Sequence, residues 1–72
     1  MLTSITREKL DEMSKEEALD QLKKSVEVRN MMGGSMHWNM LNDECCEIAN
    51  KCAELGVDRS ELTDLLGEGN YR

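Results

Sequence analysis

A chain of 72 residues supports one small domain, and its net charge of -6, from 9 basic and 15 acidic side chains, opposes direct binding to the phosphates of DNA or RNA. The chain has no Pro, no Phe and six Met, and 33% of its residues are charged. This composition favours helices, so we expect a single all-α domain over residues 1–72 that does not bind nucleic acid directly.

The cysteine count predicts a reducing cellular compartment, and the uncharged stretches of the sequence predict neither a signal peptide nor a membrane span. Three cysteines cannot all pair within one chain, which favours free thiols. The first eight residues lack the apolar run of a signal peptide. The longest uncharged stretch, 30–42, contains two glycines and several polar residues and is unsuited to span a bilayer. We therefore expect a soluble cytoplasmic protein.

Two helices are predicted in the first half of the chain. A short helix over 7–13 has Thr6 as a favourable N-cap residue. A longer helix over 15–31 begins after Ser14, because Ser14 and Glu17 have the spacing of a capping box. Its apolar residues recur at helical spacing, at Ala18, Leu19, Leu22 and Val26. A pair of consecutive glycines ends this helix, because glycine readily adopts left-handed backbone conformations.

A regular apolar stripe predicts the third helix over 38–55. Its members follow one another in alternating steps of three and four residues, which places all of them on one helix face. The stripe consists of Trp38, Leu41, Cys45, Ile48, Cys52 and Leu55. Gly56 follows at the position where a helix-ending glycine is favoured. The stripe is too short to predict a free-standing coiled coil.

The last helix is predicted from the signals at its start and end. Asp58 is a favourable N-cap residue, and Glu61 follows it at capping-box spacing. The apolar face of this helix consists of Leu62, Leu65 and Leu66. Gly67 ends the helix, and we expect residues 67–72 to form a frayed tail.

The simplest arrangement of these elements is a small antiparallel helical hairpin. The second and third helices form the hairpin, and short helices close its two ends, which gives three to four helices in all. A core of this size often needs support from a second chain. A homodimer that buries the remaining apolar surface is therefore an alternative to the monomer.

The thiol and imidazole side chains predict neither a metal site nor a catalytic pair. In a helix, the adjacent Cys45 and Cys46 point about 100° apart, and Cys45 and Cys52 lie about 10 Å apart. His37 is two helical turns from Cys45, so its imidazole is too far away to act as the base for a Cys45 nucleophile. We interpret Cys45 and Cys52 as core residues and expect Cys46 to be partly exposed. We expect no metal, no cofactor and no enzymatic activity.

A cluster of methionines and a tryptophan surrounds the expected bend of the hairpin. The cluster consists of Met31, Met32, Met36, Trp38 and Met40. Trp38 begins the apolar stripe, whereas the adjacent Met31 and Met32 cannot both face inward. Methionine surfaces suit adaptable protein recognition, and tryptophan is a common interface anchor. The alternative interpretation is that the methionines fill a core that lacks Phe.

Acidic residues are concentrated in the second half of the chain. Residues 1–35 carry seven acidic and six basic side chains, whereas residues 36–72 carry eight acidic and three basic ones. In the third helix, the acidic residues beside or opposite the apolar stripe include Asp43, Glu47 and Glu54. They form either a solubilising face or a surface for a basic partner.

Together these features favour a non-enzymatic protein–protein interaction module, such as an adaptor, a chaperone-like clamp or an inhibitor. Such a module would bind a protein partner through the methionine and tryptophan cluster and through the acidic helix face. One alternative is an acidic nucleic-acid mimic, of the kind known among phage inhibitors, that blocks a DNA- or RNA-binding protein. Another is a structural homodimer without a separate partner.

Overall fold

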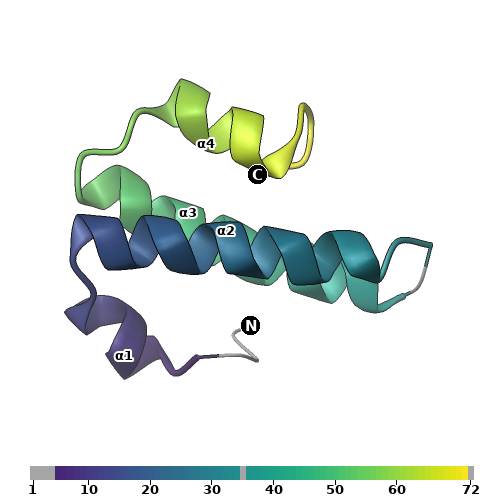
Figure 1. Cartoon of the computed structure of the whole chain (residues 1–72), viewed down its shortest axis with the longest axis horizontal. Coiled ribbons are helices and arrows are strands. Elements are labelled where there is room, and N and C mark those ends of the chain that lie inside the picture. The colour runs from purple at the N-terminus through teal and green to yellow at the C-terminus, as the bar shows by residue number, and fades with distance from the viewer. Residues whose placement is uncertain (1–4, 35, 72) are drawn as a thin grey trace.

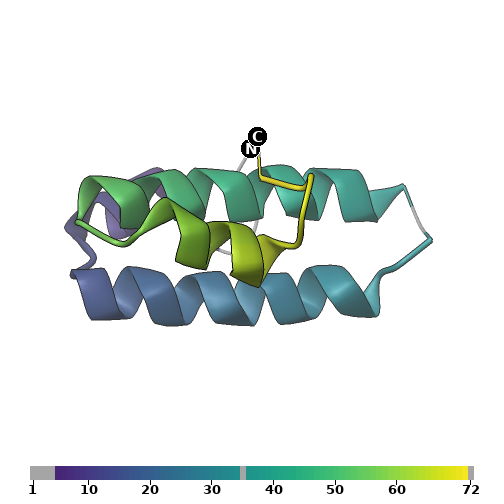
Figure 2. The same cartoon turned by 90° about the horizontal axis from the view of Figure 1, so that it is seen from above.

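The chain folds into a helical hairpin with a short helix packed on each of its two faces (Figure 1). A computed structural model describes residues 5–34 and 36–71, and these contain four helices and no strand. The helices are α1 (Arg7–Glu12), α2 (Lys15–Met31), α3 (His37–Glu54) and α4 (Arg59–Leu66). The antiparallel α2 and α3 form the hairpin, with α1 on one face and α4 on the other (Figures 1 and 2). The predicted all-α hairpin with a short helix before and after it in the sequence is confirmed, but these short helices pack on the two faces of the hairpin and do not close its two ends.

The starts of α1 and α2 follow the predicted capping chemistry. The backbone N–H of Lys9 donates to the hydroxyl of Thr6 at 3.1 Å. At α2, the N–H of Glu17 donates to the Ser14 hydroxyl at 3.3 Å, and the N–H of Ser14 donates to the Glu17 carboxylate at 3.2 Å. These bonds satisfy amide groups that have no partner within the helix, so local sequence alone determines where both helices begin.

The capping box predicted for α4 is wrong in its side-chain contacts. Asp58 is the N-cap residue of α4 and has an extended backbone, but its side chain makes no capping hydrogen bond. Residues 58–61 are all exposed. Water can therefore satisfy the first amide groups of α4, and the helix does not need the Asp58 carboxylate.

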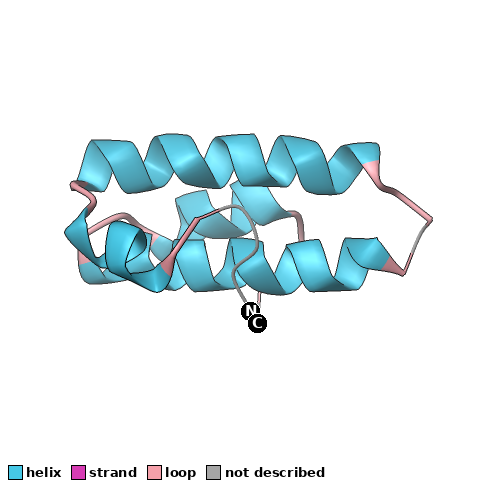
Figure 3. Cartoon of the chain, turned by 90° about the horizontal axis from the view of Figure 1, so that it is seen from below, coloured by secondary structure: helices cyan, strands magenta, loops and turns pink. Residues whose placement is uncertain are grey.

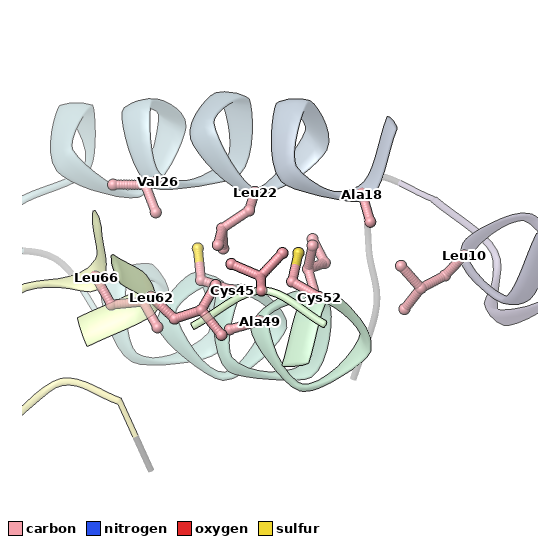
Figure 4. Packing of buried hydrophobic residues seen from close by; sticks show 11 residues of the cluster. Leu10, Ala18, Leu22, Val26, Cys45, Ala49, Cys52, Leu62 and Leu66 are labelled. Carbon is pink, nitrogen blue, oxygen red and sulfur yellow. The ribbon is translucent and has the colours of Figure 1, made fainter. Parts of the chain in front are cut away.

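The core lies between the two hairpin helices and is closed by one side of α1 and one side of α4 (Figure 4). Its buried members are Leu10, Ala18, Leu22, Val26, Cys45, Ile48, Ala49, Cys52, Val57, Leu62 and Leu66. Within the predicted stripe of α3, the middle residues Cys45, Ile48 and Cys52 are fully buried. Trp38 and Leu41 at its beginning and Leu55 at its end are only half-buried. The stripe is thus covered in its middle and not along its whole length.

The covering helices are too short to enclose the whole hairpin. α1 has 6 residues and α4 has 8, whereas α2 has 17 and α3 has 18. At 1.5 Å per residue, the covers are about 9 and 12 Å long against hairpin helices of about 26 Å. Figure 3 shows α1 beside the end of the hairpin away from the turn between α2 and α3, which leaves the turn itself bare. None of the described helices is long and apolar enough to cross a membrane.

Candidate interaction surface

The exposed apolar side chains gather at the turn of the hairpin. Among the residues that the structure describes, every large apolar side chain that is exposed lies between positions 28 and 40. These side chains, which we call the Met end, are Val28, Met31, Met32, Met36 and Met40. Met31 and Met36 are the most exposed of them, at 81% and 91%. The end of the hairpin at which α2 leads into α3 extends beyond α1 and α4 (Figure 2).

Trp38, which the sequence groups with these methionines, has a different role in the structure. It is half-buried, and the guanidinium carbon of Arg29 lies 5.1 Å from the centroid of its ring. A cation at this distance from an indole ring is attracted by the electron-rich face of the ring. Trp38 therefore joins α3 to α2 at the turn, whereas the most exposed methionines face solvent.

A shallow groove lies between α2 and α3 next to the Met end. Its volume is about 80 Å³. The groove is lined by Gln21, Lys24, Ser25, Val28, Leu41 and Glu44. Val28 belongs both to this lining and to the Met end, and Met32 follows it four residues later, directly after the end of α2. The groove and the Met end thus adjoin at Val28.

The predicted acidic residues of α3 do not share one environment. Asp43 and Glu54 are exposed, whereas Glu47 is half-buried. A carboxylate oxygen of Glu47 lies 3.6 Å from the guanidinium of Arg7 on α1. The middle of the acidic row is therefore engaged by α1, and the exposed acidic surface on α3 is divided into two parts.

Buried polar residues, which the sequence analysis missed, connect three helices near the turn. Arg29 is only 5% exposed. Its Nη1 donates to the side-chain oxygen of Asn42 at 2.7 Å and to the backbone oxygen of Leu66 at 2.8 Å. Its Nε and Nη2 donate to the side-chain oxygen of Asn30 at 3.1 and 2.8 Å. Because Leu66 ends α4, the cation also lies at the negative end of that helix dipole.

The C-terminal segment corrects the expectation of a frayed tail. The backbone oxygen of Asn70 accepts hydrogen bonds from the Asn42 amide at 3.0 Å and from the Cys46 thiol at 3.3 Å. The hydroxyl of Tyr71 donates to the side chain of Asn50 at 3.0 Å. Polar side chains on α3 therefore hold residues 67–71 in place. Arg72, the last residue of the predicted tail, lies outside the described residues.

The three cysteines are free thiols in two environments. Cys45 and Cys52 belong to the apolar core, as expected. Burial raises the pKa of Cys45 from an ordinary value of 9.0 to about 11, although the nearby Arg29 opposes the shift. Burial likewise raises the pKa of Cys52. Cys46, which was expected to be partly exposed, is only 7% exposed because the C-terminal segment covers it.

One cation contact joins α4 to the C-terminal segment. The guanidinium carbon of Arg59 lies 5.6 Å from the centroid of the Tyr71 ring, in a geometry that favours a cation–π interaction. Tyr71 is half-buried and packs against the edge of the core. The signals for this arrangement are weak in the sequence, because Arg59 and Tyr71 stand on either side of a helix end and a glycine-rich turn.

Neither a metal-ligand cluster nor a similar known protein helps to define this surface. Across residues 5–34 and 36–71, no three or more His, Cys, Asp or Glu side chains are grouped so that they could hold a metal ion. His37 is exposed at the first residue of α3, and Cys45 lies in the core. The chain matches no protein-family model, no curated protein and no solved structure.

Proposed function

We propose that this chain is a non-enzymatic interaction module that binds a protein partner through the Met end and the adjoining groove. The observation that carries the proposal is that, within residues 5–34 and 36–71, the exposed large apolar side chains are confined to positions 28–40. Single exposed apolar residues are common on protein surfaces, but a group of them at one end is typical of an interaction site. Methionine adds adaptability, because its unbranched side chain fits irregular partner surfaces.

The partner surface that fits best is an apolar ridge such as one side of an amphipathic helix. The groove between α2 and α3 supplies an apolar floor at Val28 and Leu41, and the methionines extend it towards the turn. Full burial of a methionine side chain contributes about 1.5–3 kcal/mol. Burial of Met31 and Met36 would therefore contribute about 3–6 kcal/mol against the cost of association, in a micromolar complex whose net free energy is about 8 kcal/mol.

The test compares charge substitutions at the two ends of the molecule. Met31→Glu and Met36→Glu place a charge in the Met end, whereas Ser60→Glu adds the same charge at the exposed start of α4. Immobilised wild-type protein and the three variants are incubated with lysate, and captured proteins are compared by quantitative mass spectrometry. Circular dichroism checks that all four proteins have the same helix content.

The proposal predicts a defined set of proteins that the wild type and Ser60→Glu capture equally and that both methionine variants lose. Capture that is the same for all four proteins would refute it, since the Met end would then play no part. Loss in all three variants would also refute it, because the effect would follow from the added charge and not from its position.

The two alternatives predict different responses to salt and concentration. An acidic mimic would bind through exposed carboxylates such as Asp43 and Glu54, so capture would fall steeply as salt rises and would survive the methionine substitutions. A structural homodimer would show a molecular mass and a melting temperature that rise with protein concentration. Sedimentation of the wild type and Met36→Glu over a range of concentrations separates the homodimer from a partner-binding monomer.

A further inference from the structure

The C-terminal segment 67–71, which we call the strap, contacts the same groups that hold Arg29. The side-chain amide of Asn70 donates to the backbone oxygen of Leu66 at 3.0 Å, and Arg29 donates to that same oxygen. The backbone oxygen of Asn70 accepts from the amide of Asn42, whose own oxygen accepts from Arg29. Asn70 therefore bonds to both acceptors of the Arg29 Nη1 group.

Arg29 connects these strap contacts to the Met end. Its guanidinium stacks on Trp38, which lies two residues before Met40, and bonds to Asn30, which directly precedes Met31. Each contact thus fixes one side of the turn between α2 and α3. A continuous chain of contacts runs from Asn70 through Asn42 and Arg29 to Trp38 and Asn30, which lie on opposite sides of the turn.

The strap is attached by polar contacts and by the Tyr71 ring at the edge of the core, and it contains two glycines. Beneath it lie Asn42, Cys46 and Asn50, whose polar atoms water can solvate when the strap leaves. Segments held in this way open at a lower free energy than the apolar core. Gly67 and Gly69 have φ angles of 98° and 83°, so both occupy a left-handed conformation that favours glycine.

We propose that the strap is a conformational device that opens without unfolding the helices and that, when closed, orders the Met end through Arg29. Its regulatory meaning rests on the proposed function, because the Met end is the proposed binding surface. Closure of the strap keeps both hydrogen-bond acceptors of Arg29 Nη1 in position. It therefore favours the stacked state of Trp38, in which the Arg29 guanidinium lies over the indole ring. By linkage, any change that favours the stacked state of Trp38 must also favour strap closure by the same factor.

Both ends of this device can be measured in the free protein. Alkylation of Cys46 by iodoacetamide reports strap opening, because the thiol is covered by Asn70. In this reaction the sulfur forms a bond to carbon, iodide leaves and the thiol proton passes to solvent. Cys52 in the core reports global unfolding. Quenching of Trp38 fluorescence by acrylamide reports the state of the turn, since Trp38 is the one tryptophan of the chain.

Tyr71→Ala is the variant that perturbs the strap far from Arg29. It removes the hydrogen bond to Asn50 and the contact with Arg59. Loss of one hydrogen bond and one cation–π contact predicts that Cys46 alkylation accelerates about tenfold over the wild type, and that Trp38 quenching increases. In the reverse direction, Trp38→Leu should accelerate Cys46 alkylation.

One control variant separates this coupling from general destabilisation. Gly56→Ala strains a left-handed residue, with a φ of 103° and no neighbour within 4 Å, equally in the strap-closed and strap-open states. It should therefore accelerate alkylation of Cys52, which requires global unfolding, and leave Cys46 alkylation and Trp38 quenching unchanged.

Three results would overturn the inference. If Cys46 and Cys52 react together, the strap opens only when the protein unfolds. If Tyr71→Ala leaves Cys46 alkylation unchanged, the strap is not an opening element. If it accelerates alkylation but Trp38 quenching stays the same, the strap opens but does not order the turn. None of these readouts uses a partner, so failure here is distinguishable from failure of the proposed binding function.

Discussion

Ionisation of the buried Cys45 thiol should destabilise the protein at alkaline pH. The thiol has a pKa of about 11 in the folded chain against an ordinary value of 9.0, because burial disfavours the thiolate. Between these values the unfolded chain releases the proton and the folded chain keeps it. Stability is therefore complete below about pH 9 and falls as the pH rises towards 11.

The expected loss is large for a domain of this size. Two pH units at about 1.4 kcal/mol each give a decrease of about 3 kcal/mol in the free energy of unfolding. A chain of 72 residues has a total free energy of unfolding of about 4–11 kcal/mol. Urea titrations followed by circular dichroism, in steps from about pH 8 to about pH 11, measure the decrease directly.

The matched variant is Cys45→Ala, which removes the ionising group. It should be less stable than the wild type at pH 8, because it leaves a small cavity, but its stability should fall less steeply with pH. A remaining slope is expected from Cys52, whose pKa is also raised by burial. Equal slopes in the wild type and Cys45→Ala would refute the reasoning, because the alkaline loss would then come from other groups.

Four further substitutions test packing, the strap and the helix caps in urea titrations at neutral pH. Leu22→Ala empties a fully buried site between the hairpin helices and should lower the free energy of unfolding by about 2–5 kcal/mol; a loss below 1 kcal/mol would contradict the packing described. Gly67→Ala should cost about 1–2 kcal/mol, because its φ is 98° and the new Cβ would lie 2.8 Å from the Asn70 amide; an unchanged midpoint would contradict that geometry. Ser14→Ala should lower the free energy of unfolding by about 1 kcal/mol and Asp58→Ala by much less, because of these two residues only Ser14 makes a side-chain capping bond. A larger loss for Asp58→Ala than for Ser14→Ala would contradict this explanation.

The parts of the fold that depend on local chemistry were predictable from the sequence. The boundaries of α2 follow from a capping box at Ser14 and from glycines after Met31, all within a few residues of the helix ends. The buried middle of α3 follows from the spacing of its apolar residues. Such signals act over one or two turns, so they can be identified without knowing the tertiary structure.

The contacts of Arg29 and the strap were not predictable in the same way. Arg29 and Asn42 are 13 residues apart, and Arg29 and Leu66 are 37 apart. A charged residue near the end of an exposed helix is usually solvated, and no local rule indicates that α4 will end beside it. The only hint for Asn42 is its place at i+4 from Trp38, on the edge of the apolar stripe.

The residues of the candidate surface were predictable from the sequence, but which of them are exposed and which pack within the fold was not. Met31 and Met32 are adjacent on one helix, so at least one of them had to face outward. Trp38 packs on Arg29 because of the register between α2 and α3. The sequence pattern does not specify this register. Whether this surface binds a partner stays a prediction.

The bare turn of the hairpin makes one end of this molecule open to change in sequence and length. The core is closed by α1 and α4 away from the turn, so residues added between Gly33 and Gly34 would displace no core side chain. The free energy of closing a loop rises only about 0.6 kcal/mol for each doubling of its length. The hairpin could therefore carry an inserted peptide at its tip, and related chains could differ in length at this position while they share the same core.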